Sequence, residues 1–219
     1  MSKTSQKTGQ PAAAKRKVPV LAIVFVGVAA LLIAAMFLGS GSTADAGEQT
    51  GAPVITGEAL PEFPNPPPFS PDADPAFGLV APEVVGTDFE DNPVEITHDG
   101  TPTAVIFVAH WCPHCQAEVP RVTQWLAETG GVEGVDIVSV SSAVDDRSTN
   151  YPPSSWLAEE DWPIPVIRDD ATSSVIRAYG NGGFPYWVFL DGEGRVVART
   201  AGQLETAQLE ALLIALAGS

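Results

Sequence analysis

Both cysteines of the 219-residue chain lie in the pentapeptide Trp-Cys-Pro-His-Cys, at a predicted change from strand to helix. Residues 103–109 before it form a short, apolar run rich in β-branched residues, which predicts a buried strand. Residues 113–129 after it place apolar side chains at helical spacing. Pro113 suits the first turn of that helix, because this turn needs no backbone donor. Cys112 is therefore expected at the start of the helix, where free N–H groups and the helix dipole stabilise a thiolate.

Two cysteines are too few for a disulfide framework or for a four-cysteine zinc site. A bond between Cys112 and Cys115 would close a loop too short to add much stability, so a structural disulfide is the weaker interpretation. A solitary Cys-x-x-Cys at such a turn is typical of a redox pair. We expect Cys112 to be a partly exposed nucleophile and Cys115, one turn later and more buried, to resolve the mixed disulfide.

The order of apolar strand, Trp-Cys-x-x-Cys and helix resembles the thioredoxin superfamily. Glu118 and Pro120 extend the motif to Cys-x-x-Cys-x-x-Glu-x-Pro, which is similar to the TlpA/ResA family of membrane-anchored thiol–disulfide oxidoreductases, a group of redoxin domains. Phe184 and Pro185 stand where the superfamily keeps a cis-proline, and residues 191–199 resemble the closing hairpin of that family. The resemblance covers the whole predicted globular part and implies a thiol–disulfide oxidoreductase.

The predicted elements agree with a thioredoxin-like α/β domain, a mixed sheet with helices on both faces. A hairpin is expected over residues 81–100. It is followed by strands at residues 103–109, 135–141, 164–168, 186–190 and 194–200, and by helices at residues 113–129, 154–160, 171–179 and 205–217. The interval before the strand at residues 164–168 has room for one short helix, so the large helical insertion of DsbA-type oxidases is not expected.

The N-terminal region predicts a membrane anchor followed by a spacer. Residues 1–17 form a basic tail, and residues 18–39 form an apolar segment long enough to span a hydrocarbon core of roughly 30 Å. The basic residues before this segment predict a single-pass anchor with a cytoplasmic N-terminus and an extracytoplasmic domain. A cleaved signal peptide is the alternative. Residues 40–78 are rich in proline and predict a semi-rigid linker, which leaves the thioredoxin-like domain to residues 79–219.

The distribution of charge excludes one class of partner. Residues 18–219 contain six arginines against all 27 Asp and Glu, so binding to nucleic acid is disfavoured. We expect the partners to be protein thiols and disulfides together with a membrane redox partner. An oxidant needs a quinone-linked oxidase, whereas a reductant needs a membrane carrier of cytosolic electrons. No cofactor and no metal are expected.

His114 bears on the direction of electron transfer. The tetrapeptide Cys-Pro-His-Cys is that of DsbA-type oxidases, and an imidazole beside the Cys112 thiolate stabilises the reduced pair, which makes it a stronger oxidant. The TlpA/ResA frame instead implies a reductase, so both directions remain open. The alternative for His114 is an exposed side chain on the first helical turn without a chemical role.

The remaining candidate residues take their roles from the resemblance. Glu118 is expected to move the proton of Cys115, although it could also be a solvated residue of the first turn. Pro185 should be cis, with Phe184 offering backbone groups to an extended substrate chain; an ordinary trans turn is the alternative. Trp111 is expected to pack beside the site. Ile106 stands where thioredoxin carries a buried aspartate, which argues against a general thioredoxin-like reductase.

Two functions outside redox catalysis remain open. His110, Cys112, His114 and Cys115 are residue types that bind copper or zinc, as in a metal-binding chaperone. Four ligands within six residues do not all converge where a strand leads into a helix, so this interpretation is disfavoured. The second alternative is a tethered interaction module whose thiols are inert.

Overall fold

The computed structural model describes residues 49–64 and 73–219, and the account that follows concerns these residues. The predicted basic tail (1–17) and membrane anchor (18–39) lie outside them. None of the described helices combines the length and the apolar character that crossing a membrane requires.

A five-stranded mixed sheet forms the centre of the domain, with the strand order β6-β5-β4-β7-β8. Its strands are β4 (Thr103–Val108), β5 (Asp136–Ser141), β6 (Val166–Arg168), β7 (Tyr186–Leu190) and β8 (Val196–Ala201). β4, β5 and β6 are parallel, β7 runs antiparallel to β4, and β8 runs antiparallel to β7. β4 is buried along its whole length at the middle of the sheet, which explains why its sequence is continuously apolar. The mixed α/β sheet predicted from the sequence is therefore observed.

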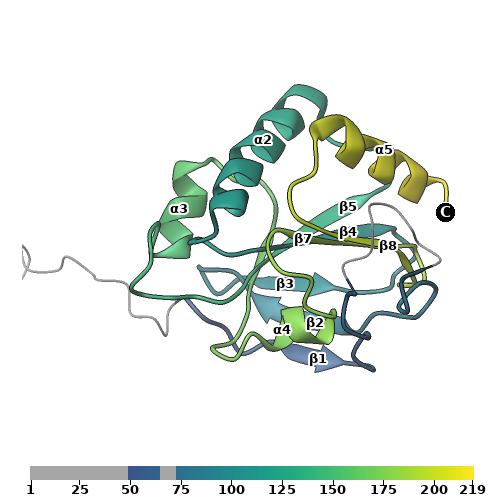
Figure 1. Cartoon of the computed structure of the whole chain (residues 1–219), viewed down its shortest axis with the longest axis horizontal. Coiled ribbons are helices and arrows are strands. Elements are labelled where there is room, and N and C mark those ends of the chain that lie inside the picture. Colours follow the sequence, from purple (N-terminus) through teal and green to yellow (C-terminus); the bar gives the residue numbers. More distant parts are fainter. Residues whose placement is uncertain (1–48, 65–72) are drawn as a thin grey trace, which may run out of the picture. The chain divides into compact units, whose positions relative to one another are not determined.

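Helices α2 (Pro113–Thr129), α3 (Pro153–Glu159) and α5 (Thr206–Ala217) cover one face of this sheet (Figure 1). Side chains alternate along the strands, so Ile106 and Trp187 face these helices, while Phe107 and Tyr186 face the opposite layer. The opposite layer contains the short helix α4 (Ser174–Ala178) together with a second, smaller sheet. Each face of the central sheet therefore has its own apolar core.

The second sheet is antiparallel and consists of β1 (Val54–Thr56), β2 (Glu83–Thr87) and β3 (Pro93–Ile96), in that order. Its β2–β3 hairpin is the one predicted near residues 81–100. Val84 and Ile96 are both almost fully buried and join the core beneath the central sheet.

Of the linker expected over residues 40–78, the structure describes residues 49–64 and 73–78, and it corrects the expectation there. Strand β1 pairs with β2, and Leu60 and Ala76 are buried in the domain core. Proline does not prevent strand formation at β1, because most prolines of this region lie between residues 61 and 75. The apolar residues Ile55 and Leu60 therefore pack against the fold, and the domain begins well before Leu79.

Element boundaries also differ where side chains or prolines compete with the backbone pattern. Strand β6 begins at Val166 because Pro163 and Pro165 have no N–H to donate to a ladder. Helix α4 is shorter than the predicted helix at residues 171–179, because the carboxylate of Asp169 accepts the N–H groups of its first turn.

Candidate active site

Cys112 occupies the position that the sequence predicts, at the residue before the first turn of α2. Helix α2 begins at Pro113, and the N–H of Gln116 donates to the carbonyl of Cys112 at 3.0 Å. Cys112 and Cys115 are both free thiols. The expectation of a partly exposed Cys112 is corrected, since only 6% of this residue is exposed. Its Sγ lies 3.5 Å from the carbonyl oxygen of Phe184, so the loop before β7 covers it.

Cys115 is fully buried one turn further along α2. Its Sγ accepts a hydrogen bond from the N–H of Ala109 at 3.5 Å. Burial raises the pKa of the Cys115 thiol strongly, because a thiolate loses its hydration in this environment. Cys115 is therefore a neutral thiol at physiological pH and needs a proton acceptor before it can attack a disulfide.

The loop that covers Cys112 contains the cis peptide bond Phe184–Pro185, as predicted. The Phe184 and Trp111 rings meet edge to face, with centroids 5.8 Å apart and an interplanar angle of 82°. The Trp111 side chain donates from Nε1 to the carbonyl of Ala143 at 2.7 Å and remains 36% exposed. Trp111 and Phe184 thus form an aromatic pair beside Cys112, with part of Trp111 open to solvent.

Glu118 is completely buried on the same side of α2, which rules out the alternative of a solvated glutamate. Its Oε1 accepts from Trp187 Nε1 at 3.1 Å and from the N–H of Leu204 at 3.3 Å, while Oε2 accepts from Arg121. The pKa of Glu118 is raised because burial disfavours the carboxylate. The hydrogen bond from Trp187 and the charge of Arg121 oppose this shift without cancelling it. Such a carboxyl group takes up a proton more readily than a solvated glutamate does.

Three consecutive residues before α5, the turn at residues 203–205, contact three residues on one face of α2. His114 Nδ1 lies 3.4 Å from Gln203 Oε1, the N–H of Leu204 donates to Glu118, and Glu205 lies 3.7 Å from Arg121. His114 itself is exposed on the first turn of α2. The sequence analysis did not identify this turn, because its contacts join segments far apart in the chain.

His110 has a structural role that the sequence analysis missed. It is fully buried, its Nδ1 donates to the carbonyl of Thr149 at 2.8 Å, and its Nε2 accepts from the N–H of Asp145 at 3.2 Å. Burial lowers the pKa of His110, so its ring is neutral. One feature of the sequence indicated this role: His110 stands between a predicted buried strand and the cysteine motif.

Neither ring nitrogen of His110 is free to bind a metal. Across residues 49–64 and 73–219, no group of three or more His, Cys, Asp or Glu side chains is arranged to hold a metal ion.

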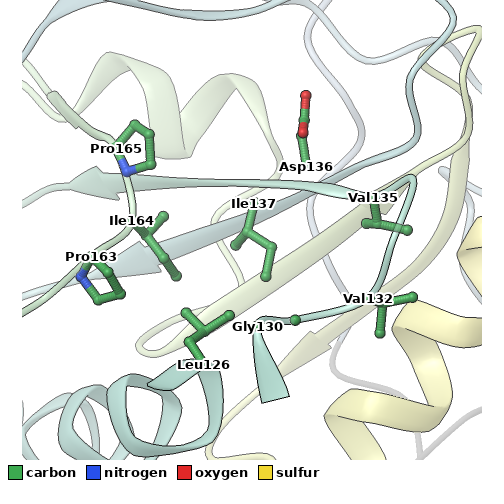
Figure 2. Close-up of a pocket in the computed structure, with 10 residues that line it drawn as sticks. Leu126, Gly130, Val132, Val135, Asp136, Ile137, Pro163, Ile164 and Pro165 are labelled. Carbon is green, nitrogen blue, oxygen red and sulfur yellow. The ribbon is translucent and has the colours of Figure 1, made fainter. Parts of the chain in front are cut away.

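A cavity of about 350 Å³ lies at the other end of α2, and Figure 2 shows its lining. It is bordered by Leu126 and Gly130 at the end of α2, by Ile137 at the start of β5, and by residues 163–165. Cys115 and Leu126 are 11 residues apart on α2, which separates the cavity from the dithiol by about 16 Å along the helix axis. This cavity is therefore separate from the candidate active site.

Comparison with known proteins adds an independent line of information. The sequence matches the Redoxin family over residues 72–213. It is 29% identical over 138 residues to the thiol-disulfide oxidoreductase ResA of Bacillus cereus, covering 63% of this chain and 76% of that protein. It is 30% identical over 146 residues to the methylamine utilization protein MauD of Paracoccus denitrificans, covering 65% of this chain and 66% of that protein. A thiol:disulfide interchange protein of Chlorobium tepidum has the same fold, with a TM-score of 0.53 at 23% identity over 64% of this chain and 96% of that one.

Proposed function

The chain belongs to the Redoxin family and is a thiol–disulfide oxidoreductase with a thioredoxin-like fold, and from this premise we propose that it exchanges disulfides with client proteins through Cys112 and Cys115. One observation carries the proposal. Two free thiols one helical turn apart lie at the start of α2, and the outer one touches the peptide of Phe184 that precedes the cis-proline.

In the reducing direction, the Cys112 thiolate attacks one sulfur of a client disulfide. A bond forms between Cys112 and that sulfur, and the other client sulfur leaves as a thiolate that takes up a proton. Cys115 then loses its proton and attacks the sulfur of Cys112. This second step forms the Cys112–Cys115 disulfide, releases the remaining client sulfur as a thiol, and leaves the client with the electron pair. Oxidation of a client dithiol is the same sequence in reverse.

Glu118 is the proton acceptor for Cys115 in this scheme. Both groups are buried on α2, and the charge of Glu118 raises the pKa of the Cys115 thiol. Two negative charges so close together in a buried site are disfavoured, so loss of the thiol proton is coupled to its uptake by the carboxylate. The pair holds one proton between its two members as the thiolate forms.

The surface beside Cys112 is suited to an extended client chain. Trp111 and Phe184 provide an apolar contact, and the backbone around Pro185 provides hydrogen-bonding groups for strand addition. No charged group of the client is required by this arrangement. Trp111, Phe184 and Pro185 are therefore the proposed substrate-binding residues.

The place of action and the direction of transfer are the remaining parts of the proposal. The apolar segment at residues 18–39 and the basic residues before it support an anchored protein whose domain faces the extracytoplasmic side. His114 supports an oxidant, whereas the likeness to ResA supports a reductant. A reduction potential measured against glutathione buffers decides between them. A value above about −150 mV favours the oxidant and a membrane oxidase as partner, and one below about −230 mV favours the reductant and a membrane electron carrier.

Replacement of each cysteine is expected to cause a different defect in the reaction. Cys112→Ser should abolish exchange with a protein disulfide, because it removes the attacking sulfur. Cys115→Ser should abolish turnover but accumulate a covalent complex with the client, because the mixed disulfide is no longer resolved. Both results can be measured by insulin reduction and by non-reducing electrophoresis of the full chain in detergent.

The Cys112→Ser protein is also the control for trapping, since it should form no covalent complex. If the Cys112→Ser protein exchanged disulfides at the wild-type rate, another group would have to perform the reaction. The same would follow if the covalent complex formed equally well without Cys112.

A further inference from the structure

We propose that Arg121 is a positioning residue of the dithiol chemistry, which holds the buried Glu118 side chain as the carboxylate that accepts the proton of Cys115. The inference rests on the proposed role of Glu118 and adds a residue that the Cys-x-x-Cys-x-x-Glu-x-Pro motif does not contain. Arg121 lies one residue beyond this motif, on the same face of α2 as Glu118.

The hydrogen bonds around Glu118 give the first argument. Trp187 and Leu204 both donate to Oε1, so Oε2 is the oxygen on which a proton would settle. That oxygen accepts from Arg121. A protonated Oε2 would place its hydrogen against an N–H of the guanidinium, which has no acceptor to offer. Arg121 therefore favours the charged form of Glu118 through geometry as well as through charge.

The distribution of charge gives the second argument. Among the three donors within residues 49–64 and 73–219 that contact Glu118, only Arg121 carries a positive charge. The Glu118 side chain is completely buried, whereas 28% of the Arg121 side chain is exposed. Part of the Arg121 side chain therefore stays in contact with water, while the carboxylate that it stabilises has no such contact. Removing Arg121 would leave a buried carboxylate held by two neutral donors, which favours its protonation.

The other charged or titratable groups near this pair act more weakly or in the opposite direction. Glu205, before α5, lies 3.7 Å from Arg121, but 78% of its side chain is exposed and water screens its charge. Cys115 lies on α2 beside Glu118, and a thiolate there would raise the pKa of the carboxyl group. β7 contributes the neutral Trp187. Arg121 is thus the group that keeps Glu118 ready to accept a proton while Cys115 is still a thiol.

The test compares the two chemical steps in the full chain in detergent. Arg121→Met should move the midpoint of the pH profile for resolution of the mixed disulfide upward by about one unit. At pH values below that midpoint resolution should be about tenfold slower, since one unit corresponds to a factor of ten. Attack by Cys112, measured in a Cys115→Ser background as formation of the mixed disulfide, should keep its rate. Arg121→Lys, which retains the charge, should recover most of the resolution rate.

Two further variants separate this role from a structural one. Arg195→Met is the matched control, because it removes an arginine from an exposed ion pair with Glu193 and should leave both steps unchanged. In a Glu118→Gln background, Arg121→Met should cause no further change in the pH profile, because the group on which it acts is gone. Thermal unfolding of each variant shows that the comparison is made on folded protein.

The outcomes distinguish the inference from the function on which it rests. If Glu118→Gln resolves the mixed disulfide at the wild-type rate, the proposed proton acceptor is wrong, and the inference fails with it. If Glu118→Gln is slow but Arg121→Met keeps the wild-type pH profile, the inference alone is overturned. An equal slowing of both chemical steps in Arg121→Met also overturns it, because a general disturbance of the fold would then explain the loss.

Discussion

His110 lies two residues before Cys112, and both of its ring nitrogens bind the backbone of the loop at residues 143–149. Two nearby side chains contact the same loop. Trp111 donates to the carbonyl of Ala143, and Gln116 lies 3.4 Å from the hydroxyl of Thr149. Three side chains around the cysteine motif therefore fix one wall of the candidate active site. Because Nε2 of His110 accepts a hydrogen bond, protonation of the ring would break the contact with Asp145.

The lowered pKa of His110 gives a pH dependence of stability. The folded protein binds this proton less readily than the unfolded chain, whose histidine titrates near about 6.5. The contribution of His110 is therefore complete above that pH and is lost as the pH falls below it, with a slope of at most about 1.4 kcal/mol per pH unit. We expect the free energy of unfolding, measured in urea, to be lower at pH 5.5 than at pH 7.5.

His110→Gln is the comparison variant, because glutamine does not titrate. It should be less stable than the wild type at pH 7.5 but should change less between the two pH values. An equal pH dependence in both proteins would assign the effect to other groups.

At the scale of elements, a buried polar contact joins β8 to the segment just before Leu79. The guanidinium of Arg199 forms a buried ion pair with Asp74 through two nitrogens, and it also donates to the carbonyls of Pro61 and Tyr179. The Phe63 ring lies against the same guanidinium, 5.2 Å from its centre. One side chain thereby connects β8, the end of α4 and the residues that cross beneath the sheet. The pKa of Asp74 is lowered despite its burial, because Arg199 compensates.

Asp74→Asn should destabilise the protein by about 3–5 kcal/mol, because it leaves the Arg199 charge buried without its partner. Urea unfolding at pH 7.5 measures this loss. The double variant Asp74→Asn with Arg199→Met should recover part of it, since no uncompensated charge remains.

Glu193→Gln is the matched control for the Asp74 variant. It breaks an exposed ion pair with Arg195 and should change stability by less than about 1 kcal/mol. Similar losses in the two single variants would contradict the role assigned to burial.

At the scale of the whole molecule, the sequence predicted what local pattern determines. The strand–cysteine–helix order, the cis peptide before Pro185 and the succession of the central strands all have signals within a few residues. Other features depend on partners far away in the chain, such as the bond between Arg199 and Asp74, which spans 125 positions. The burial of Cys112 by Phe184 is of the same kind, because no local pattern shows which loop closes over the thiol.

The domain boundary illustrates this limit and leads to a prediction. A fragment of residues 49–219 should unfold cooperatively, whereas a fragment of residues 79–219 should be less stable by at least about 3 kcal/mol. The shorter fragment lacks β1, Leu60 and Asp74, and it leaves Arg199 without its carboxylate. Circular dichroism during thermal and urea unfolding measures the difference. Equal stability of the two fragments would show that residues 49–78 contribute little to the free energy of unfolding of the domain.

The turn at residues 203–205 touches His114, Glu118 and the residue paired with Glu118, and it leads directly into the last helix. We therefore expect mechanical load on the carboxyl terminus to reach Glu118, the proposed proton acceptor of the inner thiol. An affinity tag or fusion partner joined at that end needs a flexible linker. A rigid fusion should alter the rate of exchange although it contacts neither Cys112 nor Cys115.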